Sequence, residues 1–128
     1  MERLLGRLAD VAYAAMRVVL AFIFFCHGIQ KLTGALGGQQ VALGSLRGVA
    51  SLIETIGGPL IAIGLFTSPV AFIASGEMAA AYFISHAPRG GLPVQNRGEL
   101  AVALCFAFLY IATRGGGRFS LDRVRRRT

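Results

Sequence analysis

Four long apolar segments, separated by short stretches rich in glycine, proline and charge, constrain this chain more than any other feature. They cover about residues 11–29, 49–66, 69–86 and 98–113. About 20 consecutive apolar residues are enough to cross the hydrocarbon core of a bilayer as a helix. Hydrophobic residues make up 55% of the chain and charged residues only 15%, which is well below the charge of an average soluble domain. The sequence therefore predicts an all-α membrane protein in which residues 1–128 form a single domain.

The basic residues lie mainly at the two ends of the chain. Lysine and arginine concentrate on the cytoplasmic side of membrane proteins, and an even number of spans places both ends on one side. We therefore predict a four-helix transmembrane bundle with both termini cytoplasmic. The net charge of +7 does not indicate nucleic-acid binding, because no basic helix face with stacking aromatic residues accompanies it. The basic residues near the ends are Arg3, Arg7, Arg114, Arg118, Arg123, Arg125, Arg126 and Arg127.

Two ionisable residues lie deep inside the apolar segments. Arg17 is about six residues from the inner end of the first segment, and Glu77 is about eight residues from the inner end of the third. At 1.5 Å per residue these depths are about 9 and 12 Å, so they match. Charged residues within a membrane usually face a partner or a wet cavity. We therefore predict an intramembrane ion pair between Arg17 and Glu77. The sequence leaves open whether this pair has a structural or a functional role. Arg17 also makes the first segment a retained helix in our interpretation, rather than a signal peptide.

A second polar group is expected near the outer surface. Residues four apart share a helix face, and two such pairs occur, one on the first segment and one on the third. Acidic residues near the outer ends of the second and fourth segments lie at a similar depth. We predict that these side chains converge in a ligand-binding outer polar pocket, formed by His27, Lys31, Glu54, Tyr82, His86 and Glu99. They lack a tight metal-binding spacing such as HxxxH, so we predict no metal site.

The two cysteines, Cys26 and Cys105, fall in the outer third of the first and fourth segments. Two cysteines without a CxxC motif do not form a disulfide framework. Free cysteine usually behaves as a small apolar residue. The sequence leaves open whether this pair is redox-active.

Several runs of the sequence resemble signatures of the DoxX family, in the family's order. Arg17 followed by residues 27–31 (HGIQK) is similar to its first-helix signature. Residues 54–58 (ETIGG) and 64–67 (GLFT) resemble its second-helix motif and the turn after it. Residues 115–122 (GGGRFSLD) resemble its terminal motif. One departure is Gly116, where many relatives have proline.

This resemblance implies a four-helix, multi-pass protein of the bacterial inner (plasma) membrane. Family members are linked to respiratory and sulfur redox chemistry. One branch resembles a subunit of thiosulfate:quinone oxidoreductase, and another is described as a membrane partner of oxidative-stress enzymes. A shared fold does not by itself transfer an activity, which has to be argued from the site.

Taken together, the pocket and the resemblance favour an accessory or quinone-interacting subunit of a membrane redox system. In that reading quinone is the cofactor, a redox enzyme is the partner protein, and a homo-oligomer stays open. A stand-alone enzyme is disfavoured, because the sequence has no nucleotide-binding loop and no nucleophile–base pair. Two alternatives remain, namely a small-solute or proton-linked transporter or channel, and a structural membrane adaptor without catalysis.

Overall fold

The computed structural model describes residues 1–128 and contains helices but no strands. Four helices are long: α2 (Ala9–Thr33), α3 (Leu46–Ile63), α4 (Thr67–Ala81) and α6 (Glu99–Arg114). The predicted all-α fold class is therefore confirmed. The short elements are α1 (Glu2–Leu5), η1 (Gly6–Leu8), η2 (Tyr82–His86), η3 (Ala87–Arg89), α5 (Pro93–Asn96) and α7 (Leu121–Arg125).

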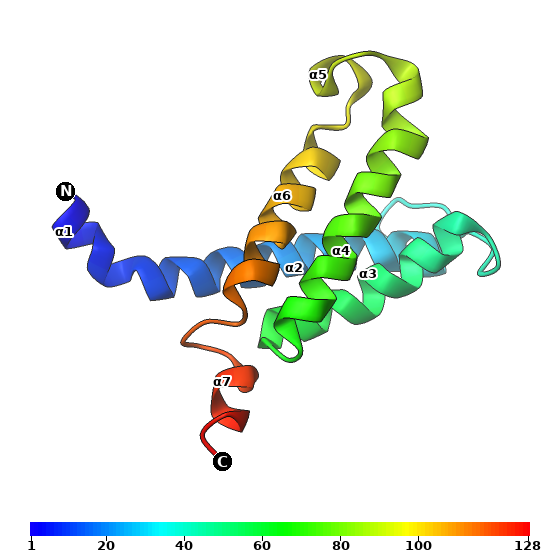
Figure 1. Ribbon diagram of the computed structural model, residues 1–128. Coiled ribbons are helices and arrows are strands. Elements are labelled where there is room, and N and C mark those ends of the chain that lie inside the picture. The colour runs from blue at the N-terminus through cyan, green and yellow to red at the C-terminus, as the bar shows by residue number, and fades with distance from the viewer.

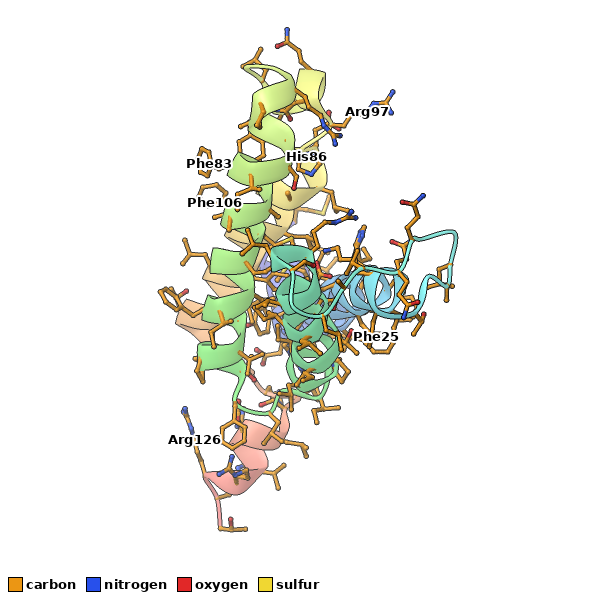
Figure 2. The ribbon with its side chains drawn as sticks, turned by 90° about the vertical axis from the view of Figure 1, so that its right-hand side faces the viewer. Phe25, Phe83, His86, Arg97, Phe106 and Arg126 are labelled. Carbon is orange, nitrogen blue, oxygen red and sulfur yellow. The ribbon has the colours of Figure 1, made fainter.

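The long helices form two antiparallel hairpins. Helices α2 and α3 lie side by side in one hairpin, and α4 and α6 lie side by side in the other (Figure 1). The two hairpins cross instead of running parallel, and this crossing is visible in both perpendicular views (Figures 1 and 2). The chain passes from the first hairpin to the second through a short turn between α3 and α4. The hairpins thus meet near their middles, and each keeps a free loop end.

The core between the hairpins combines aromatic rings with small residues. Phe24 of α2 and Phe108 of α6 are fully buried, and their rings meet edge to face with centroids 4.8 Å apart. Within the first hairpin, a Cβ at Gly58 would lie only 2.7 Å from the Cβ of Phe25. Close approach of helix backbones through small residues is typical of membrane helices, where packing must replace the hydrophobic effect.

The outside of the molecule is largely apolar. Only 25 of the 128 residues are buried, so most apolar side chains face outward. Two helical stretches, Glu2–Thr33 and Leu46–Ile63, are long and apolar enough to cross a membrane by length and composition. Helices α4 and α6 are shorter, with 15 and 16 residues. Every long helix nevertheless exposes large apolar side chains, with 60–65% exposure for Phe22, Ile56, Phe72 and Phe106.

Arg17 is buried beside the C-terminus of α3, at the end of the first hairpin away from the loop that joins α2 to α3. Its side chain is 1% exposed. One guanidinium nitrogen donates to the carbonyls of Ile61 and Ala62, and the other donates to the carbonyl of Phe119. The last carbonyls of a helix have no partner within the helix, and a cation is favourable there. Arg17 therefore caps the C-terminus of α3 and ties the C-terminal tail to it.

The predicted ion pair between Arg17 and Glu77 is not formed. The guanidinium donates to backbone carbonyls only, and Glu77 lines a pocket on another side of the molecule. The prediction compared depths along the helices but not directions around them. It also left out the carbonyls at the end of α3, which accept from one of the terminal guanidinium nitrogens of Arg17 in place of a carboxylate.

Asp122 in the tail caps the N-terminus of α4. Its carboxylate accepts hydrogen bonds from the backbone N–H of Phe66 at 2.8 Å, and from the N–H and hydroxyl of Thr67 at 2.8 and 2.7 Å. Its own N–H donates to the carbonyl of Gly64 at 2.9 Å. A Cβ at Gly64 would lie 2.4 Å from the Cβ of Ser120, so glycine is needed for the tail to dock. The turn between the hairpins is thus held from a distant part of the chain.

Replacing Arg17 with methionine should leave the Ala62 and Phe119 carbonyls without a donor, whereas the Ile61 carbonyl still accepts from the Gly64 N–H. Since each unsatisfied buried acceptor costs about 1–3 kcal/mol, we expect a loss of roughly 2 kcal/mol or more in the free energy of unfolding. Thermal unfolding in detergent would measure this loss, with Arg7→Met on the exposed 3₁₀ turn as the matched control. Combining Arg17→Met with Glu77→Gln should be additive, because the two side chains do not interact. If the losses in the free energy of unfolding were strongly non-additive, Arg17 and Glu77 would interact after all, as the ion pair predicts.

Asp122 should make stability depend on pH. Burial raises the pKa of Asp122, but hydrogen bonds from the Thr67 hydroxyl and from the N–H groups of Thr67 and Phe66 outweigh this effect and place the pKa below its usual value. The ionised carboxylate is therefore favoured in the folded state. Its contribution is complete above the unfolded pKa of about 4, and it is lost as pH falls through the lower folded value.

We accordingly expect Asp122→Ala to lower the free energy of unfolding by about 1–2 kcal/mol at pH 7, the usual size of a lost N-cap. This difference should shrink below about pH 4, where the wild-type carboxylate becomes protonated. Asp10→Ala is the control, since the Asp10 side chain is 44% exposed and lies 3.6 and 3.9 Å from Arg114 and Arg118. If the stability difference between the wild type and the Asp122 variant did not change with pH, the ionised carboxylate of Asp122 would not be the cap of α4.

Candidate functional site

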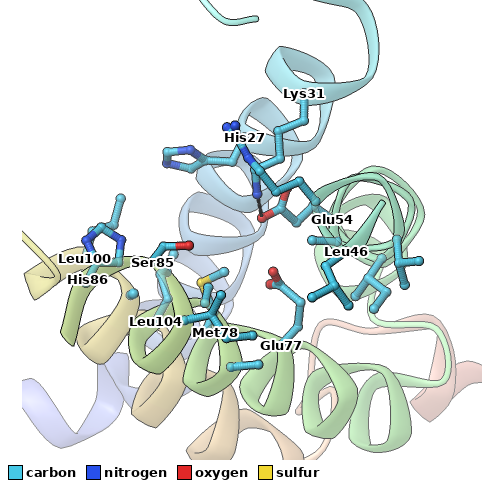
Figure 3. A pocket seen from close by; sticks show the side chains of 18 of the residues that line it. His27, Lys31, Leu46, Glu54, Glu77, Met78, Ser85, His86, Leu100 and Leu104 are labelled. Carbon is cyan, nitrogen blue, oxygen red and sulfur yellow. Dashed lines mark hydrogen bonds and ion pairs between the residues drawn. The ribbon is translucent and has the colours of Figure 1, made fainter. Parts of the chain in front are cut away.

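An open pocket of about 990 Å³ lies between the two hairpins. Helices α2 and α3 form one wall, and α4, the π-helical turn η2 and the start of α6 form the other (Figure 3). Twelve of its 22 lining residues are hydrophobic, so it offers an apolar body with a few polar positions. Mixed surfaces of this kind are typical of pockets for small organic molecules. The crossing of the hairpins creates this space.

Lys31 and Glu54 form an ion pair across the first hairpin. Lys31 Nζ lies 2.7 Å from Glu54 Oε1, and their side chains are 21% and 1% exposed. Glu54 Oε2 is buried and has no hydrogen-bond partner. The close contact of α2 and α3 here depends on Gly28, where a Cβ would lie 2.5 Å from the hydroxyl of Thr55. His27 stands one turn before Lys31 and lines the same wall.

Glu77 enters the pocket from the opposite hairpin. Its carboxylate points toward the Lys31–Glu54 pair (Figure 3), and its Oε2 is buried without a hydrogen-bond partner. The pocket thus holds two carboxylates and one amine. The sequence analysis missed Glu77 as a pocket residue. A signal was available, because Glu77, Ala81 and Ser85 follow one another at spacing four, and all three line this pocket.

His86 is positioned by a π-helical turn and by a buried asparagine. The helix continues from α4 into η2, and His86 is the last residue of this turn. Its Nδ1 lies 3.2 Å from the backbone carbonyl of Asn96. Asn96 is 1% exposed and fastens the loop before α6, donating to Tyr82 Oη and to the Gly90 carbonyl and accepting from the Gly98 N–H. π-Helical turns inside α-helices often occur at functional sites.

The structure brings four of the six predicted pocket residues together. His27, Lys31, Glu54 and His86 line the pocket. Tyr82 does not, because its hydroxyl accepts a hydrogen bond from Asn96 in the loop network. Glu99 is exposed in the first turn of α6, where a negative charge suits the helix N-terminus. Their membership of the pocket is therefore corrected. Asn96, the only asparagine of the chain, was missed because its role depends on the loop conformation.

The mouth of the pocket is basic. Arg47 from the start of α3, and Arg89 and Arg97 from the loop between η2 and α6, join Lys31 among the lining residues. These four cations face two carboxylates. All three arginines are exposed, whereas Glu54 lies deep in the wall. The pocket is thus acidic at its base and basic at its rim.

The two cysteines lie outside the pocket. Both are free thiols, and Cys105 Sγ lies 3.6 Å from the hydroxyl of Ser75, which donates to the Cys105 carbonyl at 2.7 Å. No three His, Cys, Asp or Glu side chains lie close enough together to hold a metal ion. The chemistry of the site therefore has to be argued from its amine, imidazole and carboxyl groups.

Comparison with known proteins agrees with the motifs. The model of a family described as DoxX matches residues 12–87. An uncharacterized protein of Haemophilus influenzae is 40% identical over 116 residues, which cover 85% of this chain and 87% of that protein. The inner membrane protein YqjF of Escherichia coli is 28% identical over 131 residues, which cover 92% of this chain and 95% of that protein. No solved structure matches the chain. The family match covers more than half of the chain, and so this membrane protein belongs to the DoxX family.

Proposed function

We propose that this protein is a quinone-binding accessory subunit of a redox system in the bacterial inner membrane. One observation carries the proposal. The junction of the hairpins holds an apolar pocket whose base contains the Lys31–Glu54 pair and two carboxylate oxygens without partners. Buried polar groups normally have partners, and those that do not need an explanation. A quinone whose reduced form carries hydroxyl groups provides one, because these hydroxyl groups can donate to such oxygens.

The topology that goes with this proposal has four spans and two cytoplasmic termini. The exposed apolar side chains of α4 and α6, including Phe72 and Phe106, suit contact with lipid as well as those of α2 and α3. Both ends of the chain are rich in arginine, in keeping with the positive-inside rule. The relative from Escherichia coli is named an inner membrane protein. The pocket would then lie toward the outer face, beside both long loops.

Quinone fits the chemical character of the pocket. Its ring and isoprenoid tail are apolar and would pack against side chains such as Ile73, Ile84 and Leu100. Its carbonyl oxygens accept hydrogen bonds, which His27 or the remaining N–H groups of Lys31 can donate. The lining side chains are not themselves redox-active. Electrons would therefore pass between the quinone and a partner protein, which makes this chain an accessory subunit and not an enzyme on its own.

One observation favours a second candidate, proton-linked transport. Glu54, Glu77 and Lys31 face the same pocket from two hairpins, and ionisable residues within a membrane often mark substrate or proton paths. Such a path would have to continue from the pocket to the other side of the membrane. There the space between the hairpins is filled by Phe24, Phe108 and their buried neighbours. This closed core favours binding over transport.

Quinone binding should depend on the pocket. We expect detergent-purified protein to bind a short-chain benzoquinone, with affinity lowered about tenfold by His27→Ala, as for one lost hydrogen bond. Ala81→Phe should weaken binding by narrowing the pocket, whereas Ala103→Phe on the exposed face of α6 should not. Titration followed by optical spectroscopy would measure both. Unchanged binding in Ala81→Phe would refute the site. Solute flux in reconstituted vesicles that is lost in Glu77→Gln would favour transport instead.

The proposed topology predicts which loops face outward. In a variant with Cys26 and Cys105 replaced by alanine, single cysteines at exposed positions would be labelled with a membrane-impermeant maleimide in intact cells. We expect Gln39→Cys and Gln95→Cys to react, because both loops would be external. Thr128→Cys should react only after the membrane is permeabilised. Protection of Gln95→Cys would reduce the number of spans from four to two.

A further inference from the structure

We propose that the pocket binds the hydroquinone form of its ligand in preference to the quinone form, because its inner groups are hydrogen-bond acceptors. This inference rests on the proposed function and names the redox state that the site recognises. A quinone carries two carbonyl oxygens, which accept hydrogen bonds. Its hydroquinone carries two hydroxyl groups at opposite ends of the ring, which donate them. The two forms are therefore distinguished by the donors and acceptors of the wall.

Glu54 provides the first inner acceptor. Its carboxylate is fully buried, and only Oε1 is used, by Lys31 Nζ at 2.7 Å. Oε2 is buried without a partner, and Glu54 is one of the residues that line the pocket. Because Lys31 Nζ donates to Oε1, Oε2 is the oxygen left to accept from a ligand. A ligand hydroxyl at this place would satisfy Oε2, whereas a ligand carbonyl would face it with a second unpaired oxygen.

His86 provides the second inner acceptor. Its Nδ1 lies 3.2 Å from the Asn96 carbonyl, and because a carbonyl cannot donate, Nδ1 must carry the proton. In neutral imidazole the other nitrogen then has a free lone pair. No protein group hydrogen-bonds to His86 Nε2, and His86 lines the pocket. The loop network around Asn96 thus fixes the tautomer that accepts.

These two acceptors stand on different walls of the pocket. Glu54 comes from α3 and His86 from the end of the π-helical turn, and the two labelled side chains lie on opposite sides of the space in Figure 3. A ligand with hydroxyl groups at both ends of its ring offers one donor to each wall. Glu77 lies on the same side of the space as Glu54 in Figure 3, and its Oε2 is a third oxygen without a partner. His27 can donate or accept according to its tautomer, so it serves either form.

The donors of the pocket do not offset this preference. Arg47, Arg89 and Arg97 are exposed at the rim, so water already satisfies their N–H groups. Exchanging water for a ligand carbonyl there gains little, whereas giving a donor to a buried acceptor without a partner removes a full desolvation penalty. Lys31 already donates to Glu54, and its side chain is 21% exposed.

The test compares both redox forms on the full chain. Purified protein would be titrated under anaerobic conditions with a decyl-substituted benzoquinone and, separately, with its hydroquinone. We expect the hydroquinone to bind roughly tenfold to a hundredfold more tightly, the size of a hydrogen bond to a charged acceptor. Glu54→Gln keeps an oxygen for Lys31 but presents an amide donor to the pocket. It should move the affinity ratio toward the quinone by a similar factor.

Two further variants complete the design. Glu99→Gln makes the same chemical change on an exposed residue outside the pocket, and the affinity ratio should stay as in the wild type. His86→Phe removes the second acceptor without touching the buried pair, and it should weaken hydroquinone binding while leaving quinone binding nearly unchanged. This variant keeps the proposal testable where Glu54→Gln fails to fold.

The outcomes separate this inference from the proposed function. Equal affinity for the two forms, or tighter binding of the quinone, would overturn the inference and leave quinone binding standing. An affinity ratio that is unchanged in both Glu54→Gln and His86→Phe would do the same. Failure of both forms to bind the wild-type protein would overturn the proposed function together with the inference.

Discussion

The fold depends on a buried arginine that has no carboxylate partner. A cation removed from water costs far more than an apolar side chain, unless hydrogen bonds replace its hydration. Arg17 donates such hydrogen bonds to the carbonyls at the end of α3 and to the carbonyl of Phe119 in the tail. The same tail brings Asp122 to the start of α4. Because the second hairpin begins at this turn, Arg17 and Asp122 together fasten the point where the two hairpins join.

The helices could be predicted from the sequence, but this linkage could not. Apolar segments bounded by glycine and proline give the position and type of each long helix, because burial in lipid or protein demands a continuous apolar run. They do not give the direction of a side chain around the helix. Arg17 was therefore assigned to Glu77 at a matching depth, while its real partners were carbonyls. A cap supplied to α4 by Asp122, far along the chain, leaves no local signal either.

The candidate site, like the fold, was predicted from the sequence only in part. His27, Lys31, Glu54 and His86 could be predicted because ionisable residues are rare in apolar segments, so each one is conspicuous. Tyr82 was predicted to accompany His86 from its spacing of four, which holds for a regular α-helix. The rings of Tyr82 and His86 do stack, with centroids 6.4 Å apart, but the Tyr82 hydroxyl accepts from Asn96 and Tyr82 does not line the pocket. The sequence could not predict that Glu54 Oε2 and Glu77 Oε2 have no hydrogen-bond partner, because this depends only on how the helices pack.

The crossing of the hairpins explains why the pocket holds carboxylate oxygens without partners. Parallel helices would pack along their whole length and would close the space beside Glu54 and Glu77. Crossed hairpins touch near their middles, at Phe24 and Phe108, and leave an opening toward their loops. Each buried oxygen without a partner costs about 1–3 kcal/mol, and a purely structural adaptor gains nothing from that cost. A ligand that donates to these oxygens recovers it on binding, which favours a binding site over a scaffold.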